Sequence, residues 1–420
     1  MNILLQQITI ADPNSPHNGN KKDILIVDGV IDKIDNDIKD NSAACFNGDN
    51  IIASPGWVDI FSHACDPGYE FRETLETCTD AAAAGGFTEI FTLPDTNPVT
   101  DSRTQVEYIT QKSKGLKINV HPLGTVSKKR EGKELSEMYD MKQSRAIAFT
   151  DGLQPVQNAG LFLKALQYVK SFNGVIIQLP QDKSINASGL MNEGIISTRM
   201  GLQGVPSIAE ELIIARDIEL LRYTNSSLHI TGITTAKSVA LIKAAKDEGL
   251  NISCSATPYH LFFCDEDLQS YNTNLKVNPP LRNRNDMLAL REAVVNGYID
   301  CIASHHLPQD WDDKTCEFEY AKPGMIGLQT CYAAVQTGLP GLPAEQIANL
   351  FSLNARKIFG LENSSISEGN HAAITLFNTN EFIFNKEKNK SKSQNSAFLN
   401  IPLHGNVIGI VSKGNLILNN

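Results

Sequence analysis

The sequence is poor in several features that would mark a protein for nucleic acid or membrane. Lys and Arg number 37 against 47 Asp and Glu, which gives a formal net charge of −10. No excess of cations is therefore available to neutralise phosphates, and we expect no nucleic-acid partner. No apolar run approaches the roughly 20 residues that a membrane-spanning helix needs. Residues 1–7 are too short and too polar for a signal peptide, so we expect a soluble, cytoplasmic protein with no membrane partner.

Paired cysteine motifs are also missing. The eight cysteines are scattered without CxxC spacing, which excludes a zinc knuckle or a disulfide framework and favours reduced thiols. Basic clusters are equally scarce, because the one Lys/Ser run is Asn-Lys-Glu-Lys-Asn-Lys-Ser-Lys-Ser at residues 385–393. We interpret this Lys/Ser run as a solvated loop.

What the chain does contain is a central alternation of apolar strands with amphipathic helices, between strand-rich ends. This alternation is typical of parallel α/β architecture. Helical periodicity is clear at 70–83, 207–222, 236–246 and 284–295. The predicted central strands are 57–62, 88–94, 118–124, 146–151, 174–179, 228–233, 251–256 and 299–304. Eight such strands suit a (β/α)8 barrel, in which function lies at the carboxyl ends of the strands.

The stretch at residues 53–68, Ala-Ser-Pro-Gly-Trp-Val-Asp-Ile-Phe-Ser-His-Ala-Cys-Asp-Pro-Gly, opens this barrel. A strand that ends in closely spaced histidine and aspartate usually begins the barrel of a metal hydrolase. Side chains at positions 61 and 63 of a strand point to the same side, so two imidazoles there could share one divalent ion. Only His63 is present, because position 61 is Phe61.

The frame around this gap resembles the bacterial-type dihydroorotases of the amidohydrolase superfamily. The resemblance covers essentially the whole chain, and it is carried by residues 55–59, 66–68, 91–98 and 276–282. It implies an amidohydrolase-type (β/α)8 barrel over residues 55–365. It also implies that residues 1–54 and 366–420 form one small flanking β-sandwich domain.

The resemblance implies a metal site whose ligand positions are largely replaced in this sequence. Two ligands of the family are retained, His63 and the bridging carboxylate Asp151. His306 and Asn278 match substrate-binding positions, whereas Cys65 replaces a substrate-binding arginine and Asp95 an asparagine. The lost ligand positions are Phe61, Leu179, Gly232 and His305, the last of which is also the family's general-base position.

Zinc needs three or four well-placed donors, and hydrolysis of a cyclic amide needs a metal that lowers the pKa of water. We therefore expect no cofactor and no intact catalytic residue, with an apolar pocket floor. The predicted function is a dihydroorotase-like protein of pyrimidine biosynthesis that has lost hydrolysis. The resemblance suggests a structural or regulatory partner of aspartate carbamoyltransferase, and we expect a homo-oligomer.

Two other interpretations stay open at this point. His63, Asp151 and His305 could bind one zinc ion in an active dihydroorotase or another cyclic amidohydrolase. Alternatively, the pocket could serve a small-molecule sensor. Each remaining ligand also has a purely structural interpretation, in which His63 is a hydrogen-bonded barrel residue and Asp151 accepts backbone amides.

Overall fold

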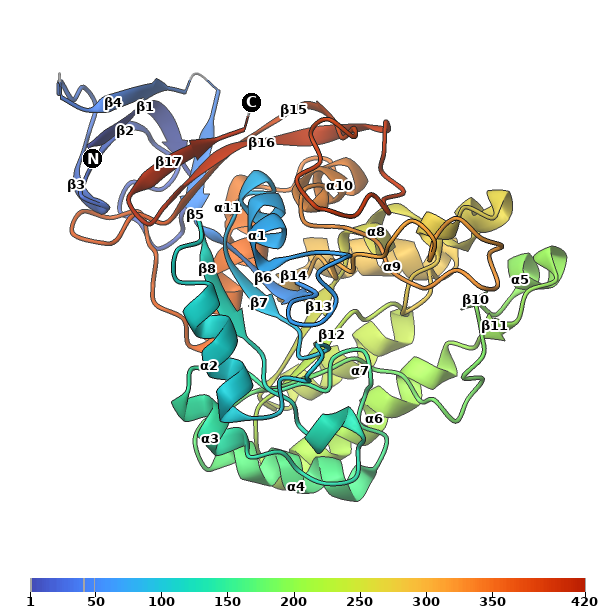
Figure 1. The fold of residues 1–420 in the computed structure, drawn as a ribbon. Coiled ribbons are helices and arrows are strands. Elements are labelled where there is room, and N and C mark those ends of the chain that lie inside the picture. The colour runs from blue at the N-terminus through green and yellow to red at the C-terminus, as the bar shows by residue number, and fades with distance from the viewer. Residues whose placement is uncertain (1, 41, 49, 420) are drawn as a thin grey trace.

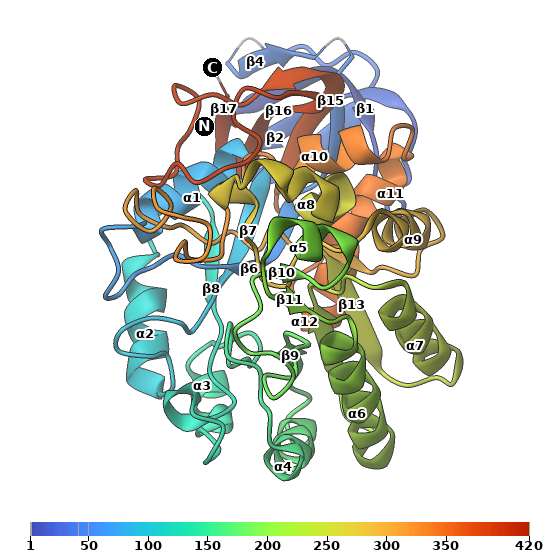
Figure 2. The same ribbon diagram turned by 90° about the vertical axis from the view of Figure 1, so that its right-hand side faces the viewer.

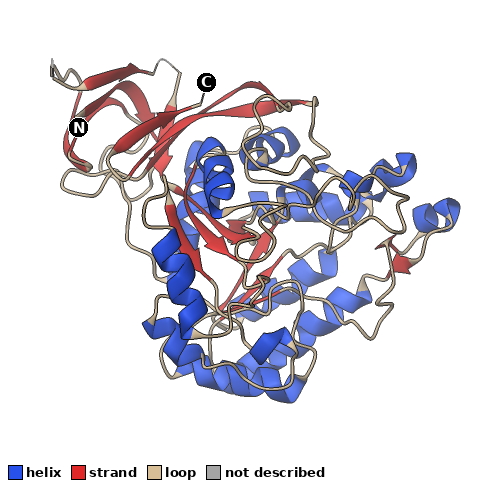
Figure 3. Ribbon diagram, in the orientation of Figure 1, coloured by secondary structure: helices blue, strands red, loops and turns tan. Residues whose placement is uncertain are grey.

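Strands from both ends of the chain pair in one eight-stranded sheet in the computed structural model, which describes residues 2–40, 42–48 and 50–419 (Figures 1 and 3). The order is β17-β16-β15-β5-β1-β2-β3, with β4 paired to β1. Their bounds are β1 Ile3–Ile10, β2 Lys21–Val27, β3 Val30–Asp35, β4 Ala44–Asn47, β5 Ile52–Pro55, β15 Ile374–Ile383, β16 Pro402–Ser412 and β17 Asn415–Leu418. The expected β domain from the two ends is confirmed.

The two ends meet where β5 runs antiparallel to β15, with Ile374 opposite Pro55. Alternate side chains of these strands are apolar and point to one side, where they form the core of the domain. The residues of that core include Ile3, Leu5, Ile24, Ile26, Ile31, Ile374, Leu376 and Val411.

The predicted barrel is also present, as two parallel sheets that isolated bridges join into a ring. One sheet contains β6 (Trp57–Ser62), β7 (Phe87–Thr92) and β8 (Asn119–Pro122). The other contains β9 (Ile176–Gln178), β12 (Leu228–Thr231), β13 (Ile252–Ala256) and β14 (Cys301–Ile302). A bridge from Ser62 to His306 joins β6 to the end of the eighth strand.

The fourth barrel segment differs from the predicted strand at 146–151. Only Phe149 makes strand-like pairs there, with Gly124 on one side and Ile176 on the other. Positive φ angles at Arg145 and Gly152 bend the chain on both sides of it. The extended stretch is therefore too short for a regular strand, although it still closes the ring.

Helices surround these strands, as Figure 2 shows for α2, α4, α6, α7 and α9. Helix α1 begins at Leu75 because the side chain of Thr74 caps it, so the predicted start at residue 70 was too early. No helix of the described chain is long and apolar enough to cross a membrane. The helices are α1 Leu75–Ala84, α2 Arg103–Lys112, α3 Met138–Gln143, α4 Ala159–Lys170, α5 Ile195–Met200, α6 Ile208–Thr224, α7 Ala236–Asp247, α8 Pro258–Phe262, α9 Arg284–Val295, α10 Cys331–Gly338, α11 Ala344–Ala348 and α12 Asn354–Phe359.

A buried ion pair fixes the loops at the carboxyl ends of β12 and β13. Glu210, at the start of α6, accepts hydrogen bonds from the backbone of Thr234 (2.8 Å) and from the hydroxyl of Ser238 (2.7 Å). Arg282 lies 3.5 Å from the other Glu210 oxygen and donates to the carbonyl of Val205 at 2.9 Å. The two side chains are only 1% and 3% exposed. This pair gives the motifs around residues 204–210 and 276–282 a structural role.

We predict that Arg282→Leu lowers the free energy of unfolding by about 3–5 kcal/mol, because it leaves the Glu210 carboxylate buried without its cation. Denaturant unfolding followed by circular dichroism measures this loss. The matched control is Arg284→Leu, which removes an exposed pair with Glu266 at 2.7 Å and should cost about 0–1 kcal/mol. Equal losses in the two variants would contradict the prediction.

Candidate functional site

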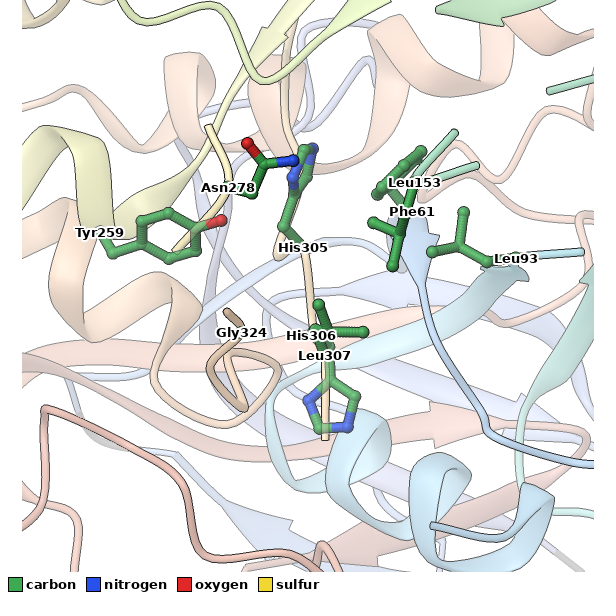
Figure 4. Close-up of a pocket in the computed structure, with 9 residues that line it drawn as sticks. All are labelled: Phe61, Leu93, Leu153, Tyr259, Asn278, His305, His306, Leu307 and Gly324. Carbon is green, nitrogen blue, oxygen red and sulfur yellow. The ribbon is translucent and has the colours of Figure 1, made fainter. Parts of the chain in front are cut away.

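The carboxyl ends of the barrel strands surround a small inner pocket of about 10 Å³ (Figure 4). Its walls are largely apolar, with Phe61, Leu93 and Leu153 facing Tyr259 across the pocket. Asn278, His305, His306 and the hydroxyl of Tyr259 supply its polar groups, and the Asn278 amide donates to Gln181 Oε1 at 3.2 Å. The inner pocket therefore has the apolar character expected from Phe61.

The imidazole of His305 occupies the centre of this site. It stacks on the ring of Phe61 with centroids 4.4 Å apart and an angle of 29° between the planes. Its Nε2 lies 2.8 Å from the hydroxyl of Thr231 at the end of β12. Burial lowers the pKa of His305 to about 3, so the ring is neutral at physiological pH. His305 is thus held between an aromatic ring and a hydroxyl group.

Gly232 lies directly against this imidazole, with a φ of +69°. A Cβ atom at Gly232 would lie 2.6 Å from His305 Cε1, which is closer than van der Waals contact permits. No side chain at position 232 can coexist with this placement of His305. The absence of a side chain at position 232 and the placement of the His305 ring therefore depend on each other.

The retained His63 uses both of its ring nitrogens inside the protein. The backbone N–H of Cys65 donates to Nδ1 at 3.0 Å, so the proton of the neutral ring is on Nε2. Nε2 then donates to the carbonyl of Asp95 at 2.9 Å. Burial lowers the pKa of His63 to about 4. No lone pair of His63 remains for a metal. Its contacts are those of a hydrogen-bonded barrel residue.

Asp151 is likewise occupied by hydrogen-bond donors of its own chain. Its Oδ1 accepts the backbone N–H groups of Val126 and Ser127, both at 2.9 Å, and Oδ2 accepts the Ser127 hydroxyl. Burial raises the pKa of Asp151 to about 6, against the opposing effect of these bonds. The carboxylate holds the loop after β8, as the structural alternative for this residue proposed.

The other expected site residues point elsewhere. Leu179 is fully buried and does not line the inner pocket. His306, expected at a substrate-binding position, turns its ring away from His305 (Figure 4). Its Nδ1 accepts from the N–H of Gly327 at 3.2 Å, and its Nε2 lies 3.3 Å from the carboxylate of Glu73. Adjacent histidines thus lie on opposite faces of the chain.

The sequence did not predict one ion pair beside the site. Arg130 forms an ion pair with Asp95, the residue expected to repel an anionic substrate. Burial raises the pKa of Asp95 to about 6, while Arg130 opposes that shift. Arg130 lies in a Ser-Lys-Lys-Arg run at residues 127–130 that is typical of a surface loop, so no motif predicts its contact with Asp95.

These contacts do not fit a metal ion. Within residues 2–40, 42–48 and 50–419, no three His, Cys, Asp or Glu side chains are grouped so that they could hold one. Of the retained family ligands, His63 and Asp151 direct their lone pairs to N–H and O–H donors. His305 has only Nδ1 without a hydrogen-bond partner among the described residues. Zinc requires three or four such donors.

Comparison with known proteins shows which family the whole chain resembles. A family model described as Dihydro-orotase-like matches residues 50–238. The dihydroorotase of Acetivibrio thermocellus is 39% identical over 422 residues, which cover 99% of each chain. The dihydroorotase of Syntrophus aciditrophicus is 37% identical over 427 residues, again 99% of each chain.

Solved structures with the same fold are more distant in sequence. L-hydantoinase (dihydropyrimidinase) from Arthrobacter aurescens superimposes with a TM-score of 0.86 at 21% identity, over 99% of this chain and 96% of the other. Dihydropyrimidinase from Brevibacillus agri gives 0.83 at 18% identity, over 100% of this chain and 95% of the other. These structures confirm the barrel with its attached sheet domain.

We predict that Gly232→Ala lowers the free energy of unfolding by about 2–4 kcal/mol, from the positive φ and the clash with His305 together. In a His305→Ala background the same change should cost only about 1 kcal/mol, because the clash is removed. A double-mutant cycle measured by denaturant unfolding gives both values.

Gly360 provides the matched control for this cycle. Its φ is also +69°, and nothing lies within 4 Å of the position of an added Cβ. Gly360→Ala should therefore cost about 1 kcal/mol with or without His305. A Gly232→Ala cost that does not change when His305 is removed would disprove the packing argument.

Proposed function

Because the chain belongs to the dihydroorotase family, we propose that it serves pyrimidine biosynthesis as a member that no longer hydrolyses cyclic amides. The observation that supports this most strongly is the position of His305, whose ring excludes any side chain at Gly232. A second support is the stacking of that ring on Phe61, where the family resemblance implies a ligand.

The chemistry of the remaining groups favours the same proposal. Opening a cyclic amide requires an activated water and a base of suitable pKa. The pKa of His305 is lowered to about 3 by burial, so it is a weak base at neutral pH. Asp151 accepts three hydrogen bonds from residues 126 and 127, which keeps its lone pairs from a water molecule.

The proposed role is architectural, as a partner of aspartate carbamoyltransferase. This partner follows from family analogy, in which inactive dihydroorotase homologues hold that enzyme in a complex. It is compatible with a barrel whose frame is intact while its inner pocket is filled. Large apolar side chains remain exposed outside the pocket, among them Ile195, Ile208, Leu212 and Tyr223.

A second candidate function is hydrolysis itself. The relatives from Acetivibrio thermocellus and Syntrophus aciditrophicus, at 39% and 37% identity over nearly the full chain, are both named dihydroorotase. This similarity favours an active enzyme with a rearranged site, in which His63, Asp151 and His305 would have to release their present partners. Metal content and activity distinguish the two candidates.

Protein purified without chelators should contain well under one zinc per chain by elemental analysis, because too few free donors remain to offset dehydration of the ion. Neither cyclisation of carbamoyl-aspartate nor hydrolysis of dihydroorotate should exceed background. Stoichiometric zinc, together with activity that Asp151→Ala abolishes, would establish the second candidate instead.

Mixing the protein with aspartate carbamoyltransferase of the same source should give a larger species in light scattering at micromolar concentration. The melting temperature of that enzyme should rise, because a partner that binds only the folded state stabilises it. An interface of this kind typically buries more than about 2,000 Å².

The control for assembly is a pair of substitutions inside the barrel. Phe61→Leu and Leu179→Met keep the apolar character of two buried positions, so they should leave assembly unchanged. If the two proteins elute separately, the architectural role loses its support, and ligand sensing by the barrel becomes the better account.

A further inference from the structure

A second and larger cavity, here called the outer cavity, opens between loops on the carboxyl side of the barrel. It has a volume of about 450 Å³ and shares no lining residue with the inner pocket. Its walls come from the loop that follows β14, the short turn Thr273–Leu275, Phe71 before α1, and the loop between β15 and β16. That last loop contains the Lys/Ser run.

Two aromatic side chains in the wall of the outer cavity are largely exposed. Trp311 is 75% exposed and Phe71 is 56% exposed. The indole of Trp311 makes no hydrogen bond or ring contact with the described residues. Large aromatic rings usually bury their surface, and an exposed pair at a cavity is typical of a site that stacks a planar ligand.

Cations line the same cavity although the chain as a whole carries a net charge of −10. They are Lys386 and Lys392, and the one carboxylate among the lining residues is Asp310. Burial lowers the pKa of Lys314 to about 7, and its amine donates to the carbonyls of Lys322 and Gly324. Lys386 has no hydrogen bond or ion pair with the described residues, and the Lys392 ammonium donates once, to the carbonyl of Glu70 at 2.7 Å. The ammonium groups of both lysines therefore retain donors for an anion.

The Lys/Ser run is more ordered than the solvated loop that its composition predicts. Ser391 and Ser393 are buried, whereas Lys392 between them is exposed. The Ser391 hydroxyl and the backbone of Lys392 both donate to the buried carboxylate of Glu73. These bonds fix the backbone of the run, and they hold Lys392 at the wall of the outer cavity.

Two amide oxygens at the outer cavity lack a hydrogen-bond partner. Gln309 is 6% exposed, and its Nε2 donates to the carbonyl of Pro323 at 2.8 Å, which fixes the orientation of the amide. Its Oε1 is buried and unpaired, as is Oδ1 of Asn274. Because both oxygens are shielded from solvent, they do not face the open cavity and supply no contact to a ligand there.

We propose that the outer cavity binds a nucleoside phosphate. The base would stack against Trp311 and Phe71, and the phosphate would lie between Lys386 and Lys392. Ring N–H or ribose hydroxyl groups would donate to Asp310, since carboxylates bind ribose hydroxyls in other nucleotide sites. This inference is independent of whether the inner pocket hydrolyses anything.

A small ligand fits these observations better than an acidic peptide. The volume of about 450 Å³ lies within the range of small-molecule sites, roughly 300–1,000 Å³. An aspartate or glutamate side chain of a peptide offers an anion but no planar ring for Trp311. A nucleotide provides the ring, the donors and the anion in one molecule.

Tryptophan fluorescence tests the proposal directly, because the chain has only two tryptophans and Trp57 is fully buried. UMP, UTP, AMP and ATP, titrated separately into the full chain, should include at least one that quenches Trp311 with saturation. Isothermal titration calorimetry should give the same affinity for that nucleotide. Trp311→Phe should abolish the quenching.

Variants that remove one lysine charge test whether Lys386 and Lys392 bind the phosphate. Lys386→Gln and Lys392→Gln should each weaken binding by about tenfold, the effect of losing one charge-assisted hydrogen bond. Lys388→Gln is the matched control in the same run, because its ammonium lies over the ring of Phe382 and does not line the outer cavity. It should leave the affinity within about twofold.

Several results would overturn the proposal. These are no binding of any of the four nucleotides at millimolar concentration, affinity that Lys386→Gln and Lys392→Gln leave unchanged, or equal affinity for tripolyphosphate, which has no ring. Competition by an acidic peptide as strong as that by the nucleotide would also contradict it, and would identify a protein-docking surface instead.

Discussion

The contact between the His305 imidazole and the backbone of Gly232 determines what this barrel can do. The ring stacks on Phe61 and bonds Thr231, and the glycine leaves the space that the ring fills. From Thr231 a chain of short hydrogen bonds continues through Ser255 to the buried His229. The polar side chains of Thr231, Ser255 and His229 therefore satisfy one another, and Nδ1 of His305 is the nitrogen of this chain of bonds left without a partner among the described residues.

The residues that stabilise this barrel are different from those at the positions that carry chemistry in the family. The frame contributes stability, as Glu210 and Arg282 show by joining two segments of the barrel rim in a buried pair. Trp57 plays a similar part at the opposite end of its strand, where it packs against Tyr332, Phe351 and Phe377. These residues match the family pattern for reasons of packing, so their presence says little about catalysis.

The sequence predicted the barrel and the joined ends well, because both follow from periodicity and from family resemblance. It predicted the fourth strand and the start of α1 poorly, since single positive φ angles and the Thr74 cap decide them. For the site, residue identity led to the prediction that metal ligands are missing, which stays a prediction. It could not reveal that His305 fills the space at Gly232, or that Arg130 approaches Asp95, because both contacts join segments distant in the sequence.

The central claim is that the remaining imidazoles are bound within the protein and do not bind metal. Nitrogen-15 NMR of the imidazole rings, before and after addition of equimolar zinc, tests it most directly. The account predicts a neutral His63 with its proton on Nε2, and resonances of His63 and His305 that zinc leaves unchanged. Zinc-dependent shifts of both rings would contradict the account and show that a metal site forms in this barrel.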